Sequence, residues 1–238
     1  MIRYTAYTIL FTIIFCFSCR AQDFSERTIS RPGASIKKYL VYLPDKYRRR
    51  STQRWPVLFF LHGKGERGDD LSRARVAGVP EILQHDLPFI LIVPQCKLTA
   101  PTWELPSLDS LYEDVKRSLR IDTNRIYLTG LSMGGYGTWI WASAHPDRFA
   151  AIVPIAGYGL SRMNPCGMRE LPIQTFHNTD DPTIKVSETR KIVQAIKGCG
   201  STQIYYRESP AGGHDAWTKV YKDAALFNWL SEKKKALP

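Results

Sequence analysis

The strongest fold signal in this chain of 238 residues is the stretch Arg125-Ile126-Tyr127-Leu128-Thr129-Gly130-Leu131-Ser132-Met133-Gly134-Gly135. Its first five residues predict a strand, and the residues from Met133 to His145 predict a helix that ends at Pro146. Glycines flank Ser132 because side chains in so tight a strand-to-helix turn would clash. Such a turn points the serine hydroxyl out of the sheet edge, so we predict a nucleophile at Ser132. The alternative is a glycine-rich helix start without chemistry.

Apolar runs bounded by turn residues recur along the rest of the chain. Several of them, such as Val57–Leu61, are continuously apolar, which is typical of parallel strands buried on both faces. The predicted strands are Lys38–Leu43, Pro56–His62, Phe89–Pro94, Arg125–Thr129, Ala150–Ile155, Pro172–His177 and Gln203–Arg207.

Segments with helical periodicity lie between these strands. The predicted helices are Leu108–Leu119, Met133–His145, Val186–Lys197 and Asp223–Lys233. For the third helix we expect Ser187 as the N-cap and Gly198 as the stop. Alternation of strands and helices predicts an α/β fold with a mostly parallel sheet and helices on both faces. No Pro/Gly/Ser-rich linker divides the chain, so we expect residues 22–238 to form one domain.

The expected base for the serine is His214. A serine at its ordinary pKa is a poor nucleophile and needs an adjacent base. After a turn of this kind the order along the chain is serine, acid, histidine. His214 meets this order in a glycine-containing loop that can fold back over Ser132; a surface histidine is the alternative. The other histidines precede the serine, lie at the end of its helix or precede the acids: His62, His85, His145 and His177.

Two adjacent carboxylates are candidates for the supporting acid. Asp180 and Asp181 follow the strand that ends at His177, where an acid-bearing loop is expected. The acid has to hold the imidazole in one tautomer and stabilise its charge. We favour Asp181, because it precedes Pro182 in a fixed turn, and we keep Asp180 as the alternative.

The oxyanion of an acyl-transfer reaction needs two backbone N–H donors. One is expected from Met133, directly after the nucleophile. The other is expected from Lys64, since Gly63 after the strand Pro56–His62 allows a close backbone approach. A phosphate-binding loop is the alternative for this glycine-rich stretch, but the Gly-Lys-Ser/Thr ending is missing.

The sequence indicates no metal, cofactor or nucleic acid. His62, Asp69 and Asp70 are close together but lack the spacing of metal ligands. The net charge of +11 could favour anionic glycans or membrane surfaces, although a solvated basic surface is the preferred interpretation. The basic runs 48–50 and 233–235 are not interleaved with aromatic residues, as a nucleic-acid site would be.

The first residues are expected to be a signal peptide, residues 1–21. Arg3 precedes an apolar stretch from Ile9 to Phe17, and small and polar residues lead to Ala21. Cleavage after Ala21 and a lipid on Cys19 are both open, and an uncleaved signal-anchor is a third alternative. The protein is therefore expected to be exported, either secreted or periplasmic, or an outer-membrane lipoprotein.

The cysteines outside this signal are Cys96, Cys166 and Cys199, an odd number. Cys166 and Cys199 each come shortly before a predicted strand, so both would lie at the amino-terminal edge of a parallel sheet. We predict a disulfide between them and a free thiol at Cys96. Three reduced cysteines are the alternative.

The order of these motifs resembles a family of exported bacterial esterases related to feruloyl and acetyl-xylan esterases and polyhydroxybutyrate depolymerases. The resemblance covers about Ser35 to Leu230 and implies an α/β-hydrolase fold without a large cap domain. It matches Ser132, Asp181 and His214 to the catalytic triad. Asn178 departs from the pattern, because the family usually has glycine there. The motifs are Leu61–Gly63, Gly65–Asp70, Pro94–Cys96, Gly130–Trp139, His177–Pro182 and Gly213–Trp217.

The expected function is that of a carboxylic ester hydrolase acting through an acyl-enzyme. Trp103 and Trp217 are candidates for a pocket that takes a flat acyl group, with simple packing as the equal alternative. A serine peptidase of the same fold, a polyhydroxyalkanoate depolymerase and a non-catalytic binding module remain as alternatives. The natural acyl group is left open between feruloyl, acetyl and other short esters.

Overall fold

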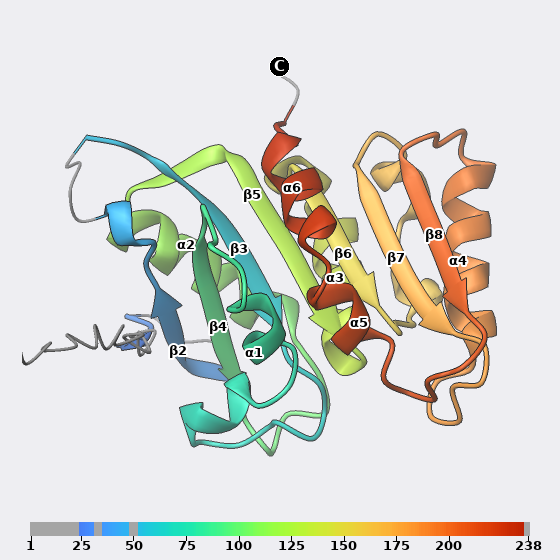
Figure 1. Cartoon of the computed structure of the whole chain (residues 1–238), viewed down its shortest axis with the longest axis horizontal. Coiled ribbons are helices and arrows are strands. Elements are labelled where there is room, and N and C mark those ends of the chain that lie inside the picture. The colour runs from blue at the N-terminus through green and yellow to red at the C-terminus, as the bar shows by residue number, and fades with distance from the viewer. Residues whose placement is uncertain (1–23, 31–34, 48–51, 236–238) are drawn as a thin grey trace, which may run out of the picture.

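The structure, a computed structural model, describes residues 24–30, 35–47 and 52–235 of the chain. The expected signal peptide, including Cys19, lies outside the described residues. Eight strands form one sheet in the order β1-β2-β4-β3-β5-β6-β7-β8 (Figure 1). The strands are β1 Phe24–Thr28, β2 Ile36–Tyr42, β3 Trp55–Leu61, β4 Ile90–Cys96, β5 Ile121–Leu131, β6 Ala151–Ile155, β7 Ile173–Asn178 and β8 Ile204–Ser209.

The sheet is parallel from β4 to β8 and antiparallel at its other end. β1 pairs with β2, and β2 with β4, in antiparallel register. The remaining pairs are parallel. Every residue of β3, β4 and β6 is buried, which explains their largely apolar sequences.

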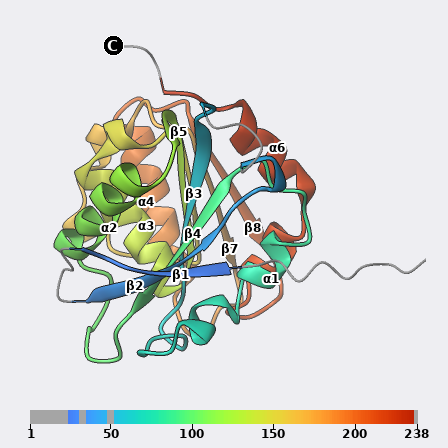
Figure 2. The ribbon, with the colours of Figure 1, turned by 90° about the vertical axis from the view of Figure 1, so that its left-hand side faces the viewer.

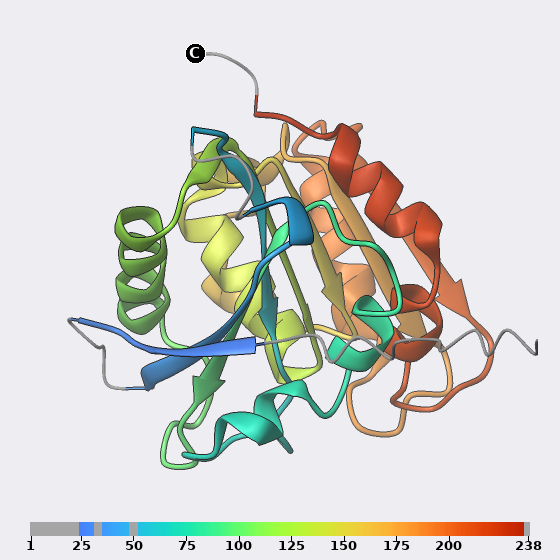
Figure 3. The ribbon, with the colours of Figure 1, turned by 60° about the vertical axis from the view of Figure 1, so that its left-hand side comes forward.

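Helices cover both faces of the sheet, as predicted (Figures 2 and 3). One face packs against α2 Leu105–Ser118, α3 Met133–Ala144 and α4 Val186–Gly198, and the other against α1 Val79–Ile82, α5 Trp217–Tyr221 and α6 Ala224–Glu232. Short 3₁₀ turns complete the fold at Asp45–Tyr47, Leu71–Arg75, Pro146–Arg148, Leu160–Arg162 and Pro165–Met168. The described connections after β3 and β6 hold only short helices, so no large cap domain covers the sheet there.

The seven predicted strands and four predicted helices all occur, with shifted ends. One cap is wrong: α4 begins at Val186, so Ser187 lies inside its first turn, and the N-cap is Lys185 without a side-chain hydrogen bond. Gly198 ends the helix as expected. At α6 the side chain of Asp223 caps the helix by accepting from the amide of Ala225 at 2.9 Å.

The structure contains the expected disulfide. Cys166 and Cys199 are bonded, with 5.1 Å between their Cα atoms and 33 residues of sequence separation. Cys96 is buried with a free thiol, and burial raises the pKa of this thiol to about 11. The cross-link therefore joins the end of α4 to the segment before β7, away from the carboxyl-terminal strand edge.

None of the helices in the described part of the chain is long and apolar enough to span a membrane.

Candidate active site

Ser132 lies in a strained turn between β5 and α3. Its backbone has a φ of 55° and a ψ of −116°, a conformation that costs free energy for a residue with a side chain. The turn is held by a hydrogen bond from the Ser132 amide to the carbonyl of Ile155 at 2.9 Å. A Cβ atom on Gly134 would lie 1.8 Å from the carbonyl oxygen of Leu61, so only glycine fits there. The backbone thus fixes the serine at the carboxyl-terminal edge of the sheet.

The structure brings Ser132, His214 and Asp181 together from three different loops. The Nε2 atom of His214 is 2.8 Å from the Ser132 Oγ atom, and its Nδ1 atom is 2.7 Å from Oδ2 of Asp181. Because a carboxylate can only accept, the hydrogen of the neutral ring lies on Nδ1 and Nε2 is left to accept from the serine. This is the arrangement in which a histidine can remove the hydroxyl proton.

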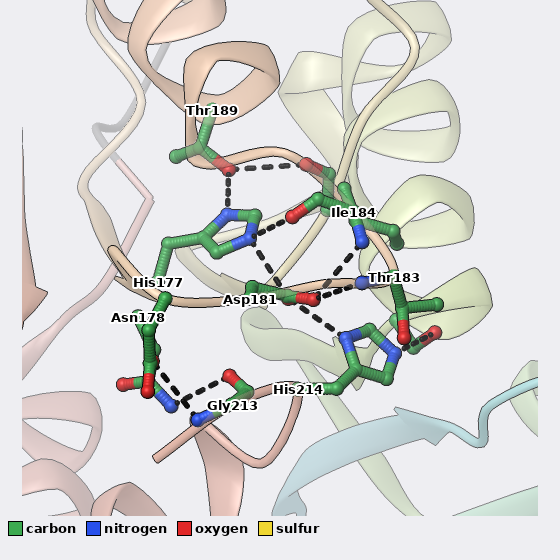
Figure 4. A network of polar contacts seen from close by, with 11 residues as sticks. His177, Asn178, Asp181, Thr183, Ile184, Thr189, Gly213 and His214 are labelled. Carbon is green, nitrogen blue, oxygen red and sulfur yellow. Dashed lines mark hydrogen bonds and ion pairs between the residues drawn. The ribbon is translucent and has the colours of Figure 1, made fainter. Parts of the chain in front are cut away.

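The Asp181 carboxylate receives hydrogen bonds on both oxygens (Figure 4). The amides of Thr183 and Ile184 donate to Oδ1 at 2.8 and 3.0 Å. Burial alone would raise the pKa of this carboxyl, but hydrogen bonds from His214, Ile184 and Thr183 outweigh it and hold the pKa below its usual range. Asp181 is therefore an anion at neutral pH.

A second histidine, His177, contacts the same carboxylate from the buried side (Figure 4). Its Nε2 atom lies 3.1 Å from Oδ2 of Asp181 and 2.9 Å from the carbonyl oxygen of Ile184. Both neighbours only accept, so Nε2 carries a hydrogen. Its Nδ1 atom lies 2.8 Å from the hydroxyl of Thr189. The order of residues along the chain argues against His177 as the base, and no sequence pattern indicates this second contact to Asp181.

Asp180, the alternative acid, points to the backbone and not to the imidazole. Its carboxylate accepts from the amides of Gly212 and Gly213 at 3.2 and 2.9 Å. Of the two adjacent carboxylates, Asp181 is the one hydrogen-bonded to His214.

The two expected oxyanion donors, Met133 and Lys64, belong to segments that lie next to Ser132. Met133 is the first residue of α3, where backbone N–H groups have no partner within the helix. Lys64 follows Gly63, at which an added Cβ would lie 3.7 Å from the Cβ of Ser132. The chain after β3 therefore passes directly beside the serine, and both Lys64 and Met133 line the adjoining pocket.

His62 fixes the peptide that carries the Lys64 amide. Its Nδ1 atom is 2.7 Å from the carbonyl oxygen of Gly63, and its Nε2 atom accepts from the amide of Cys96 at 3.1 Å. Burial lowers the pKa of His62 to about 4, so the ring is neutral with its hydrogen on Nδ1. The C=O and N–H of a trans peptide point in opposite directions, so this contact turns the Lys64 N–H away from His62.

A cavity of about 680 Å³ adjoins Ser132 and His214. Its walls combine apolar and charged side chains from the segments that follow β3, β4, β5, β6, β7 and β8. The lining residues include Lys64, Glu66, Pro101, Leu131, Met133, Tyr158, Ile184, Lys185, Glu188 and Trp217.

The two tryptophans predicted for the pocket lie in different places. Trp217 lines the cavity, with its ring centroid 5.2 Å from that of His214. Trp103 is only 2% exposed and is not among the lining residues. Its indole Nε1 donates to the carbonyl of His62 at 3.1 Å, so it packs behind the loop that follows β3. Tyr158 supplies the second aromatic wall, which the sequence did not indicate.

The described residues contain no group of three or more His, Cys, Asp or Glu side chains that could hold a metal ion. Asp70, considered above with His62 and Asp69, caps the turn Leu71–Arg75 by accepting from the amide of Ser72 at 2.9 Å.

Comparisons with known proteins agree on the fold and on the class of relatives. No family model matches the chain. The bifunctional acetylxylan esterase/xylanase XynS20E of Neocallimastix patriciarum is 27% identical over 157 residues, which cover 62% of this chain and 22% of that protein. Feruloyl esterase D of Neurospora crassa is 26% identical over 214 residues, 76% of this chain and 71% of that protein. A shorter match, 38% identical over 60 residues, is to poly(3-hydroxyalkanoate) depolymerase C of Paucimonas lemoignei and covers 25% of this chain and 14% of that one.

Among solved structures, a thermostable esterase superposes with a TM-score of 0.77 at 29% identity, covering 89% of this chain and 63% of that one. The chain spans 22% and 18% of the length of the first two curated relatives. The superposition on the thermostable esterase, together with the strand order of the sheet, shows that the chain has the α/β-hydrolase fold. Its homologues include acetylxylan and feruloyl esterases, which confirms the resemblance predicted from its motifs.

Proposed function

We propose that this protein is a serine carboxylic ester hydrolase that acts through an acyl-enzyme. The observation that carries the proposal is the chain of hydrogen bonds from Ser132 through His214 to Asp181, at 2.8 and 2.7 Å, beside an open cavity. The esterases among its relatives support the same class of reaction.

The proposed reaction has two halves. The Ser132 oxygen attacks the ester carbonyl while His214 Nε2 takes the hydroxyl proton, and the N–H groups of Met133 and Lys64 stabilise the oxyanion. Collapse of the tetrahedral intermediate releases the alcohol, to which His214 returns the proton. Water then repeats the sequence on the acyl-enzyme and releases the acid. Asp181 holds the His214 tautomer and stabilises its charge throughout.

For the substrate we propose esters of plant-type polysaccharides, with a feruloyl or acetyl group, or other short acyl esters. Support comes from the names of the relatives and from the aromatic cavity walls at Tyr158 and Trp217, which suit a flat acyl group.

We further propose that residues 1–21 direct export and that residues 22–238 are one catalytic domain. The exported protein is then either secreted or carries a lipid on Cys19. Membrane contact would then come only through that lipid.

A fluorophosphonate probe followed by substrate profiling tests this proposal. Wild type should be labelled on Ser132 and should hydrolyse p-nitrophenyl acetate and methyl ferulate. Ser132→Ala, which removes only one oxygen atom, should lose both properties with an unchanged melting temperature. Faster cleavage of matched peptide amides would favour the serine peptidase, and cleavage of hydroxyalkanoate oligomers the depolymerase. No labelling at all would favour a binding module.

A further inference from the structure

Asn178, the last residue of β7, reaches the loop that carries His214. Its side chain is buried, with 3% exposure, and its Nδ2 atom donates to the carbonyl oxygen of Gly213 at 3.0 Å (Figure 4). Gly213 directly precedes His214. A buried amide group that lost this partner would be left unsatisfied at a cost in free energy, so the contact is a strong one.

The other polar group of Gly213 is held from the same segment. Its N–H donates to Oδ1 of Asp180 at 2.9 Å, and the N–H of Gly212 donates to Oδ2 at 3.2 Å. The peptide units on both sides of Gly213 are therefore fixed. These two peptide units set the direction in which the chain arrives at His214.

The loop needs such external contacts because its own backbone is permissive. Gly212 and Gly213 have φ values of 136° and 57°, which glycine adopts freely and other residues rarely do. A Cβ atom on Gly212 would lie 2.5 Å from the Asn178 Nδ2 atom. Any side chain at position 212 would therefore clash with the Asn178 amide.

We propose that Asn178 is a positioning residue for the base: with Asp180 it clamps Gly213 and so keeps the His214 imidazole in line between Asp181 and Ser132. This inference rests on the proposed function of His214. Asp181 holds the side chain of His214, whereas Asn178 and Asp180 hold the backbone that carries it.

The experiment compares Asn178→Ala and Asn178→Asp with Thr179→Val. Alanine removes the donor, and aspartate keeps the shape but presents an acceptor to the Gly213 carbonyl. Thr179→Val is the matched control, because it removes one hydrogen bond from the same segment to the same loop, at the carbonyl of Pro210. Active sites are counted by end-point fluorophosphonate labelling, and kcat and KM for p-nitrophenyl acetate are measured per labelled site.

Loss of positioning should lower kcat about tenfold in Asn178→Ala and further in Asn178→Asp, since small displacements of a catalytic group are costly. KM should stay within about twofold, and the rate of fluorophosphonate labelling should fall with kcat. Thr179→Val should match wild type in all three. A purely structural role would lower the melting temperature and the number of labelled sites, with kcat per site unchanged, and that result would overturn the proposal.

Failure of the proposed function gives a different pattern. If wild type is neither labelled nor active on esters, the hydrolase assignment fails. Amide hydrogen exchange then tests separately whether Asn178 holds Gly213 in place. Exchange at Gly212 and Gly213 should be faster in Asn178→Ala than in wild type and in Thr179→Val. Equal exchange in all three proteins would show that Asn178 does not hold this loop.

Discussion

Asp180 and Asp181 are neighbours in sequence with separate hydrogen-bonding partners. Asp181 holds an imidazole, and Asp180 holds two backbone amides. Asp181→Asn should lower kcat by about 10⁴-fold, because an amide in this position can stabilise the wrong tautomer of His214. Asp180→Asn keeps one acceptor oxygen and should lose far less. Steady-state kinetics on one short ester, with both variants checked for folding, measures the ratio; a reversed ranking would identify Asp180 as the acid.

The hydrogen bonds to Asp181 also make stability depend on pH. Its pKa is lower in the folded protein than the ordinary value of 3.8. The stabilisation is therefore complete above the unfolded value and disappears as the pH falls through the folded value. The contribution of the Asp181 carboxylate to the free energy of unfolding, measured as the difference between wild type and Asp181→Asn, should shrink as the pH falls below about 4. Urea unfolding of both proteins across this pH range measures the difference. A difference in free energy of unfolding that does not change with pH would contradict the prediction.

His177 should influence the pH dependence of the reaction, because it competes with His214 for Oδ2 of Asp181. His177→Phe removes that donor, leaves more negative charge facing His214 and so stabilises its protonated form. The acidic limb of kcat/KM, which reports protonation of the base, should therefore move to higher pH in His177→Phe.

His177→Gln is the control for this substitution, since it keeps an N–H donor on a side chain of similar reach. Its acidic limb should stay nearer to that of wild type. The charged groups around the ring are Asp181 and, on the neighbouring strand, Glu208, which is paired with His177 in register. If the acidic limb of kcat/KM lies at the same pH in His177→Phe and in wild type, the buried histidine only supports the loop.

At the scale of elements, the sequence predicted every strand of the sheet except the edge strand β1. Strands such as β3 and β6 are buried on both faces, so their composition alone distinguishes them. β1, Phe24–Thr28, was missed because it is an edge strand with three exposed polar residues and lacks an apolar run. The five-residue helix α5 is too short for periodicity to be recognised.

The candidate site was predictable only where order along the chain carries the information. Ser132 and His214 follow from the turn pattern and the chain order. His62 and Asn178 each contact a peptide group more than 30 residues away, at Cys96 and Gly213. His177 contacts the carboxylate of Asp181 and the carbonyl of Ile184 in the loop that follows it. No local pattern specifies such pairs. Trp103 shows the same limit, since its neighbours in sequence gave no sign that its indole faces inward.

The disulfide joins two elements at the edge opposite the site. Removing it with Cys166→Ala/Cys199→Ala should lower the free energy of unfolding by about 3–4 kcal/mol, from the loop of 33 residues that it closes. Activity per folded molecule should not change, because neither cysteine touches the cavity. Denaturant unfolding combined with active-site titration separates the two quantities. Lost activity in a fully folded variant would contradict this expectation.

For the whole molecule, one continuous sheet divides two apolar clusters that share its strands. Because neither cluster can lose its packing without exposing the same strands, residues 22–238 should unfold in a single cooperative transition. Circular dichroism and active-site labelling should then give the same melting curve. Two separated transitions would show that part of the chain folds independently.

The cavity walls and the catalytic groups are held by different contacts, and this has a consequence for directed evolution. Tyr158 stacks on Tyr136, with 5.0 Å between ring centroids, and it has no hydrogen bond to Ser132, His214 or Asp181 among the described residues. Tyr158 and Pro101, which follows β4, both line the cavity. Libraries that randomise these two positions should contain many variants that still hydrolyse esters but differ in the acyl chain they prefer. These two positions are therefore the first to vary when the acyl-chain preference of this protein is to be changed.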